Sequence, residues 1–229
     1  MKPLISPPFG NWISHPRCTR VLGSFTWKRR RGLVYHTLRS FRPTAGGWVN
    51  HIGLRNPGLR TVRIDTRHVY SLAGLEDGDW EEMLPHCPVG TTIELNLSCP
   101  NVHEYGIPFG LLQRYCRRYN VIAKLPPTAA IDDMAAMCIE AGAWYLHCSN
   151  TLPIEHGGES GRRLFDVNLP IVERLAGRYP TQIIAGGGIY HATNVAWYRQ
   201  AGATQFSLAT VWLTPWRVRG ILDAIDGGG

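Results

Sequence analysis

From Val69 onward, short apolar runs alternate with segments that carry an apolar face at helical spacing. Together with two earlier apolar runs, they make roughly eight predicted strands: 4–6, 20–26, 69–73, 92–98, 121–124, 144–149, 182–185 and 205–209. Strands that alternate with helices are typical of parallel α/β folds. The alternation therefore predicts a (β/α)8 TIM barrel, with a doubly wound open sheet as the alternative.

The helices between these strands are predicted from apolar residues that recur every three or four positions. They cover 76–84, 109–119, 131–139, 170–177 and 218–225. Thr128 is a candidate N-cap for the third of them. Asn168 is a candidate N-cap for the fourth, because Pro170 suits the first turn of a helix.

The length of the chain limits how many domains it can form. Its 229 residues are enough for one sizeable core and few for two, and single α/β barrels are commonly about 250 residues long. We therefore expect one domain, residues 1–229, with shortened loops and a shortened cap over the barrel.

Polar residues and glycines stand at the C-terminal ends of the predicted strands. They are Asn96, Lys124, Asn150, Gly187 and Thr210. A closed parallel barrel gathers its active-site groups on the face where its strands end. This distribution favours the barrel over the open sheet and places a candidate site at that face.

The strand at 92–98 leads into a loop in which two asparagines flank a cysteine, over the segment Ile93 to Asn101. Amides offer neutral hydrogen-bond partners to a flat polar ligand, and a thiol can take up a proton. A free cysteine is usually a small buried apolar group, and inert packing is the alternative for Cys99. Its position after a strand, between Ser98 and Pro100, favours the hypothesis that Cys99 is a catalytic base.

Lys124 ends a strand that should be buried on both faces. A buried ammonium group is costly unless an anion meets it. The sequence allows a surface lysine or an internal ion pair. It also allows a fixed positive charge aimed at a ligand that becomes negative during a reaction.

Two glycine-rich segments are candidates for binding phosphate. Gly186–Ile189 follows a predicted strand, so its backbone amides can approach an anion closely, and Thr210 could add a hydroxyl. The last βα loops of such barrels often hold phosphate. An ordinary turn is the alternative for this segment, and a flexible linker is the alternative for Gly157–Gly161.

Composition bounds the remaining function classes. The chain has a net charge of +7 and a basic run, Lys28–Gly32, which suits a solvated loop or attraction of phosphate or nucleic acid. Six scattered cysteines without a CxxC pair predict free thiols and no metal site. No apolar run is long enough for a membrane span, so we expect a soluble, cytoplasmic protein that binds no membrane.

The segment Asn96–Asn101 resembles the signature of dihydroorotate dehydrogenases. Other segments of the chain resemble elements of the same family in the same order: 23–26, 50–54, 123–127, 150–151, 157–161, 184–189 and 209–210. The resemblance implies a barrel that binds FMN, with dihydroorotate stacked on the flavin. In that family a base removes the C5 proton of dihydroorotate while hydride passes from C6 to flavin N5, and the product is orotate.

The resemblance also implies residue roles. Cys99 matches the catalytic base of the soluble class 1 enzymes, and Lys124 matches the lysine that stabilises reduced flavin. The implied substrate-binding residues are Asn50, Gly53, Leu54, Asn96, Asn101, Asn150 and Thr151. The implied cofactor-binding residues are Ser24, Ser71, Asn96, Lys124, Asn150, Gly161, Gly187, Gly188, Ala209 and Thr210.

The chain departs from the family pattern at several places. Gly23 stands where class 1 enzymes have a second lysine, Ser71 where an asparagine is common, and the segments 60–68 and 152–156 are short. The leading hypothesis is a compact dihydroorotate dehydrogenase that acts on a small molecule in pyrimidine synthesis, with a homodimer open as its assembly. The alternatives are a flavin- or phosphate-binding barrel without dehydrogenase activity and an RNA-binding relative of the dihydrouridine synthases. We disfavour the RNA-binding alternative and expect no nucleic-acid partner.

Overall fold

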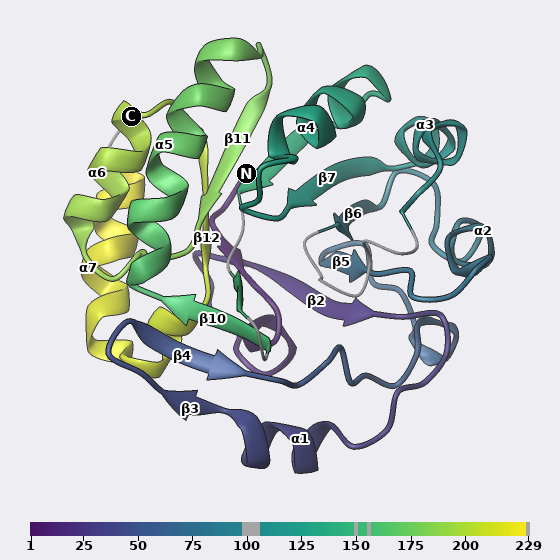
Figure 1. The fold of residues 1–229 in the computed structure, drawn as a ribbon, viewed down its shortest axis with the longest axis horizontal. Coiled ribbons are helices and arrows are strands. Elements are labelled where there is room, and N and C mark those ends of the chain that lie inside the picture. Colours follow the sequence, from purple (N-terminus) through teal and green to yellow (C-terminus); the bar gives the residue numbers. More distant parts are fainter. Residues whose placement is uncertain (98–105, 149–150, 155–156, 228–229) are drawn as a thin grey trace.

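The computed structural model describes residues 1–97, 106–148, 151–154 and 157–227. Its centre is a closed barrel of parallel strands (Figure 1). In order around the barrel these are β1 (Leu4–Ile5), β12 (Gln205–Leu208), β11 (Gln182–Gly186), β8 (Tyr145–Cys148), β7 (Asn120–Leu125), β6 (Thr92–Asn96), β5 (Val69–Leu72) and β2 (Thr19–Phe25). Because β1 pairs with both β2 and β12, the sheet has no free edge. The predicted barrel is confirmed, and an open sheet is excluded.

Helices lie outside the later strands and cover their outward faces (Figure 1). They are α2 (Asp79–Met83), α3 (Phe109–Arg118), α4 (Ile131–Glu140), α5 (Arg163–Arg178), α6 (Ala192–Gln200) and α7 (Pro215–Asp226). The apolar side of α3 shows the packing: Leu111, Leu112 and Tyr115 are buried on one face. The hydroxyl of Tyr115 donates a 2.6 Å hydrogen bond to the carbonyl of Trp80, which joins α3 to α2.

Side chains alternate between the helix layer and the barrel interior along each strand. In β7, Val121, Ala123 and Leu125 pack in the large core that includes the helices, whereas Ile122 belongs to a separate cluster. That inner cluster is an apolar layer contributed by several strands: Leu4, Val21, Val69, Ile122 and Ile184, with Tyr145 against it.

In four of these strands the next inward position is polar. Two residues after Leu4, Val69, Ile122 and Tyr145 come Ser6, Ser71, Lys124 and His147, all of them buried. The interior thus changes from an apolar layer to a polar layer toward the C-terminal ends of the strands. The buried polar side chains thus gather at the end of the barrel for which the sequence predicted a site.

A second sheet connects segments that are far apart in sequence. It contains β3 (Arg42–Pro43), β4 (Gly47–Asn50), β10 (Gly157–Gly161) and β9 (Leu152–Ile154) in that order, all antiparallel. Neither β4 nor β10 was predicted as a strand, and for Gly157–Gly161 the sequence offered a phosphate-binding segment or a flexible linker. The glycines of these strands allow close pairing, because a Cβ on Gly47 would lie 2.1 Å from the carbonyl oxygen of Ser160.

Short elements fill the remaining connections: η1 (Phe9–Asn11), η2 (Leu59–Thr61), η4 (Thr210–Leu213) and α1 (Leu33–Ser40). The helix α1 was not predicted, and neither was α6. No residue of α1 is buried, so there was no apolar face against the core to reveal it.

The predicted start of α5 was wrong. This helix begins at Arg163 and contains Pro170 in its interior. Asn168 is no cap, because its side chain is buried and its Nδ2 donates to the carbonyl of Gly186 at 2.8 Å. The cap predicted at Thr128 was also wrong, because α4 begins after Ala130 without a side-chain cap.

In the described part of the chain, no helix has the length and hydropathy needed to cross a membrane. Across those same residues, no group of three or more histidine, cysteine or acidic side chains could hold a metal ion.

Candidate active site

Glu94 lies at the centre of the polar layer in the barrel. It projects inward from β6 and is completely buried. Its Oε2 is 2.7 Å from Nδ1 of His147 on β8, and its Oε1 accepts a 2.8 Å hydrogen bond from Ser71 on β5. The ammonium Nζ of Lys124 on β7 is 3.9 Å from the same Oε1. Three neighbouring strands therefore supply partners to one carboxylate.

The surroundings of Glu94 keep it ionised. Burial alone raises the pKa of a carboxyl group, but the charge of Lys124 and the hydrogen bonds from His147 and Ser71 outweigh it and lower the pKa of Glu94 to about 2. Burial lowers the pKa of His147, although Glu94 opposes this effect. We therefore assign a carboxylate to Glu94 and a neutral imidazole to His147.

A chain of side-chain hydrogen bonds runs from Glu94 to Asn96. The hydroxyl of Ser71 is 2.7 Å from that of Ser24 on β2, and Nδ2 of Asn96 donates to Ser24 at 2.8 Å. Glu94 and Asn96 share the inward face of β6 because they are two residues apart. This series of hydrogen bonds thus connects two inward side chains of β6 through its neighbour β5 and the next strand, β2.

Lys124 is nearly as buried as its partner, with 6 % of its surface exposed. It stands opposite Asn96 in the register of β6 and β7, and opposite His147 in the register of β7 and β8. Of the sequence-based alternatives for Lys124, the surface lysine is excluded and the internal ion pair is present. A role toward a ligand stays a prediction.

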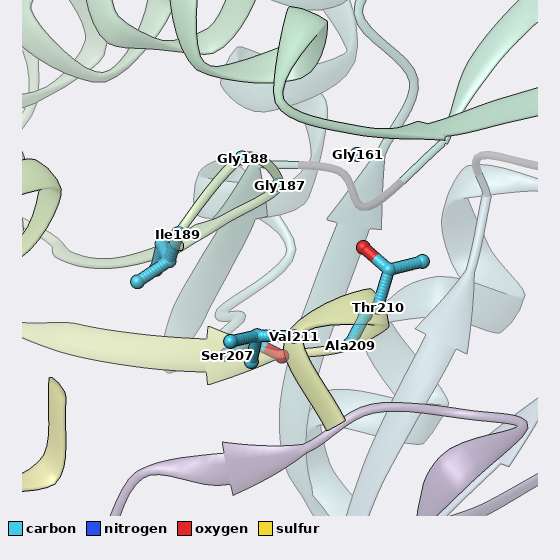
Figure 2. A pocket seen from close by; sticks show the side chains of 8 residues that line it. All are labelled: Gly161, Gly187, Gly188, Ile189, Ser207, Ala209, Thr210 and Val211. Carbon is cyan, nitrogen blue, oxygen red and sulfur yellow. The ribbon is translucent and has the colours of Figure 1, made fainter. Parts of the chain in front are cut away.

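A second feature of the barrel end is a small pocket (Figure 2). Its lining residues come from β10, the turn after β11, and the segment from β12 into η4: Gly161, Gly187, Gly188, Ile189, Ser207, Ala209, Thr210 and Val211. Five of the residues predicted to bind the cofactor line it: Gly161, Gly187, Gly188, Ala209 and Thr210. The structure therefore brings the two predicted glycine segments to one place.

The turn at Gly187 and Gly188 needs glycine. Both residues have positive φ, 79° and 71°, a region that other residues rarely adopt. A Cβ on Gly188 would also lie 2.5 Å from the backbone nitrogen and the Cβ of Phe165. Across the pocket, the hydroxyl of Tyr190 donates a 2.7 Å hydrogen bond to Oγ1 of Thr210, which fixes that side chain.

The small sheet holds two of the remaining predicted residues near Gly158, at the end of β10 that lies away from Gly161. Asn50 on β4 pairs in register with Gly158 on β10, the strand that ends at Gly161. Thr151 lies against β10 as well, because its Cγ2 would be 2.3 Å from a Cβ on Gly158. Strand β10 thus joins the predicted substrate residues to the pocket.

Gly53 and Leu54 lie in the loop after β4. Gly53 accepts a hydrogen bond from Nε of Arg30 at 3.2 Å, and Leu54 accepts one from Nδ2 of Asn56 at 2.7 Å. This loop thus contacts the basic segment around Arg30 rather than the polar layer. The remaining predicted site residues, Cys99, Asn101 and Asn150, lie outside the described residues.

Two residues of the polar layer were missed by the sequence analysis, Glu94 and His147. The missed signal was a charged or titratable side chain inside an apolar strand, in Ile93-Glu94-Leu95 and in Leu146-His147-Cys148. A buried charge requires a partner, and strand alternation would have placed Glu94 on the face of Asn96 and His147 inside the barrel.

Comparisons with known proteins find dihydroorotate dehydrogenases among the relatives of this chain. The chain is 34% identical over 206 residues to the dihydroorotate dehydrogenase B (NAD(+)) catalytic subunit of Geotalea daltonii, covering 73% of this chain and 67% of that protein. It is 28% identical to a putative dihydroorotate dehydrogenase A (fumarate) of Aeropyrum pernix, with 90% and 78% covered.

Among solved structures, a ligand-free dihydroorotate dehydrogenase from Eimeria tenella matches with a TM-score of 0.66 at 18% identity, covering 89% of this chain and 75% of that one. This likeness supports the fold. No protein-family model matches the chain.

Proposed function

Because the chain belongs to the dihydroorotate dehydrogenase family, whose members are oxidoreductases acting on a CH–CH bond, we propose that it oxidises dihydroorotate to orotate with FMN as its cofactor, as one domain of 229 residues. The observation that carries the proposal is the shared location of two features at the C-terminal end of the barrel. One is the glycine-lined pocket, and the other is the polar layer with Lys124 and Asn96.

The donors around the pocket fit a phosphate group. The positive φ angles of Gly187 and Gly188 let backbone approach an anion without a side chain in the way. Thr210 and Ser207 add hydroxyls, and Gly161 and Ala209 keep the lining small. We propose that these residues hold the phosphate of FMN.

The polar layer fits the ring end of the same cofactor. When bound, FMN supplies the acceptor for the hydride that leaves C6 of dihydroorotate. Lys124 provides a fixed positive charge, which stabilises negative charge that develops beside it. Asn96 and Ser24 offer polar contacts. Ser71, which is fully buried, holds Ser24 in place through the hydrogen bond between their hydroxyls.

For the substrate, we propose that amides hold the flat pyrimidine ring and its carboxylate. The residues assigned to this task are Asn50, Gly53, Leu54, Asn96, Asn101, Asn150 and Thr151. Cys99 is assigned as the base that takes the proton from C5. A base must have a pKa matched to the working pH, so the thiol of Cys99 should give an activity that rises in mild alkali.

Anaerobic flavin reduction tests the proposal. Protein purified under native conditions should be yellow, release FMN on denaturation, and bleach on addition of dihydroorotate. A protein that stays colourless after incubation with FMN would overturn the assignment. A yellow protein that dihydroorotate does not bleach would instead be a flavin-binding barrel without this activity.

The variant Cys99→Ser tests the base. It should keep FMN bound, bleach more slowly, and shift the pH dependence of bleaching upward, because a hydroxyl is a weaker acid than a thiol. Equal rates for both forms across pH would remove Cys99 from this role. Reoxidation of the bleached enzyme by fumarate, quinone, NAD(+) or oxygen would then identify the electron acceptor.

A further inference from the structure

The proposed reaction assigns no task to Glu94 and His147, although they are the most deeply buried titratable pair in the barrel interior that the structure describes. Both side chains have no exposed surface. Replacing such a pair with apolar residues of similar volume is often neutral or stabilising. The contacts of Glu94 with Ser71, His147 and Lys124 indicate a role beyond packing.

The hydrogen bonds of Glu94 have a defined direction. A carboxylate only accepts, so Nδ1 of His147 must carry the proton in the 2.7 Å bond to Oε2. The hydroxyl of Ser71 donates to Oε1. Because its proton is used there, Ser71 accepts from Ser24, and Ser24 accepts from Nδ2 of Asn96. In this series of hydrogen bonds, each donor thus lies on the Asn96 side and each acceptor on the Glu94 side.

The second contact of Glu94 is electrostatic. Lys124 Nζ is 3.9 Å from Oε1, and both groups are shielded from water. Opposite charges at this distance stabilise each other's charged forms. Among the described residues, the titratable groups of the cluster are Glu94 on β6, Lys124 on β7 and His147 on β8, of which only Glu94 is anionic.

We propose that Glu94 is a positioning residue for the reaction, which orients the amide of Asn96 through Ser71 and Ser24 and keeps Lys124 charged, with His147 as the neutral donor that holds the carboxylate in place. This inference rests on the proposed function, because it is that function which gives Asn96 and Lys124 their tasks. Glu94 itself touches neither substrate nor cofactor in this scheme.

The lysine content of the chain makes a direct test practical. The sequence contains only three lysines, Lys2, Lys28 and Lys124, so protein labelled with 13C at lysine Cε gives three signals. Lys2→Arg and Lys28→Arg identify the two exposed lysines, which serve as internal references. The positions of these signals at one fixed pH then report the surroundings of Lys124 without substrate and without turnover.

Glu94→Gln should displace the 13Cε signal of Lys124 relative to the two reference signals, because the buried ammonium loses the carboxylate that lies 3.9 Å away. Glu94→Asp keeps the charge on a shorter side chain and should reverse more than half of that displacement. Ser71→Ala is the matched control: it interrupts the hydrogen bonds that lead to Asn96 but leaves the carboxylate, and should displace the Lys124 signal by less than half as much. An unchanged Lys124 in Glu94→Gln would overturn the proposal.

A measurement on the unmodified protein keeps the proposal testable if Glu94→Gln does not fold. The 15N shifts of the His147 ring should show a neutral imidazole protonated at Nδ1 at neutral pH. A ring protonated at Nε2 alone would contradict the assigned direction of the bonds, and a charged ring would contradict the assignment of His147 as a neutral donor. Neither measurement depends on turnover, so a protein that shows the lysine shift yet fails to bleach would refute the proposed function and leave the Glu94 to Lys124 coupling standing.

Discussion

Lys124 and Glu94 form a buried ion pair on adjacent strands, with Nζ 3.9 Å from Oε1 and no more than 7 % of either side chain exposed. Their strands, β7 and β6, are paired in parallel so that Lys124 stands beside Asn96. An acidic group, a basic group and an amide thus share the polar end of the barrel interior. The pair should govern how the stability of the protein depends on pH.

The first prediction concerns acid. The pKa of Glu94 falls from an ordinary 4.5 to about 2 on folding, so Glu94 contributes stability that is fully present above about pH 4.5 and is lost as the pH falls toward 2. At roughly 1.4 kcal/mol per unit, this loss is about 3 kcal/mol. Urea unfolding at stepped pH should show it in the natural protein, whereas the stability of Glu94→Gln should change less over the same interval.

The second prediction concerns Lys124→Met. The variant leaves the Glu94 carboxylate buried without its cation, which should cost about 3–5 kcal/mol at pH 7. Because the pKa of Glu94 then rises, protonation relieves part of the cost as the pH is lowered. Equal losses at pH 5 and pH 8 would show that the lysine acts by packing alone.

The matched control for this variant is Lys28→Met. Lys28 pairs with Glu76 at the surface, where both side chains are more than half exposed. Exposed pairs contribute at most about 1 kcal/mol, and salt screens them. Lys28→Met should therefore change the unfolding free energy little at pH 7, and this small effect should disappear as Glu76, whose pKa the hydrogen bond from Lys28 lowers, is protonated in acid.

The barrel and the polar residues at one end of it could be predicted from sequence because strand alternation and strand ends are local signals. Residues such as Lys124 and Thr210 stand out as polar groups where an apolar strand stops. The sheet of β3, β4, β10 and β9 could not be predicted in this way. Strand β10 is rich in glycine and β4 begins with one, and propensity assigns glycine to turns. The pairing of these two strands joins Asn50 to Gly158 across 108 residues of sequence.

The contact between Glu94 and His147 could not be predicted from sequence for a different reason. Glu94 and His147 each interrupt an apolar strand, and sequence alone does not say that they meet. Their contact depends on the order of strands in the closed barrel, which sets β6 and β8 on either side of β7. The register of three strands, rather than any motif, creates this part of the site.

A third prediction concerns the glycine turn of the pocket. Gly188→Ala places a Cβ 2.5 Å from the backbone of Phe165 at a φ of 71°, and should destabilise the protein by about 1–3 kcal/mol. It should also weaken FMN binding at least about tenfold, or 1.4 kcal/mol. Thermal unfolding and fluorescence titration with FMN measure the two effects.

Gly220→Ala is the matched control for that substitution. Gly220 lies in α7, and an added Cβ there would meet no atom within 4 Å. Alanine is favoured over glycine in a helix by about 1 kcal/mol, so this variant should be slightly more stable and bind FMN normally. A loss of FMN binding in both variants would mean that the effect is not specific to the pocket.

The last prediction concerns thiol chemistry. Burial raises the pKa of Cys18, Cys87 and Cys116 to about 11, and that of Cys138 and Cys148 to about 12. At pH 8 a thiol with a pKa of 11 is about one part in a thousand thiolate, and the thiolate is the reactive form. If Cys99 is the accessible base of the site, iodoacetamide should modify it first, and orotate should slow that modification.

Peptide mass spectrometry can decide this outcome. Trypsin leaves Cys87 and Cys99 together in the segment from His68 to Arg114, but cleavage after Glu94 separates them. Cys99→Ser should abolish the fast phase of alkylation and leave the slow phase of the other five thiols unchanged. Early labelling of any of those five, or no protection of Cys99 by orotate, would contradict the assignment. In that case the proton of dihydroorotate would have to be taken by another group.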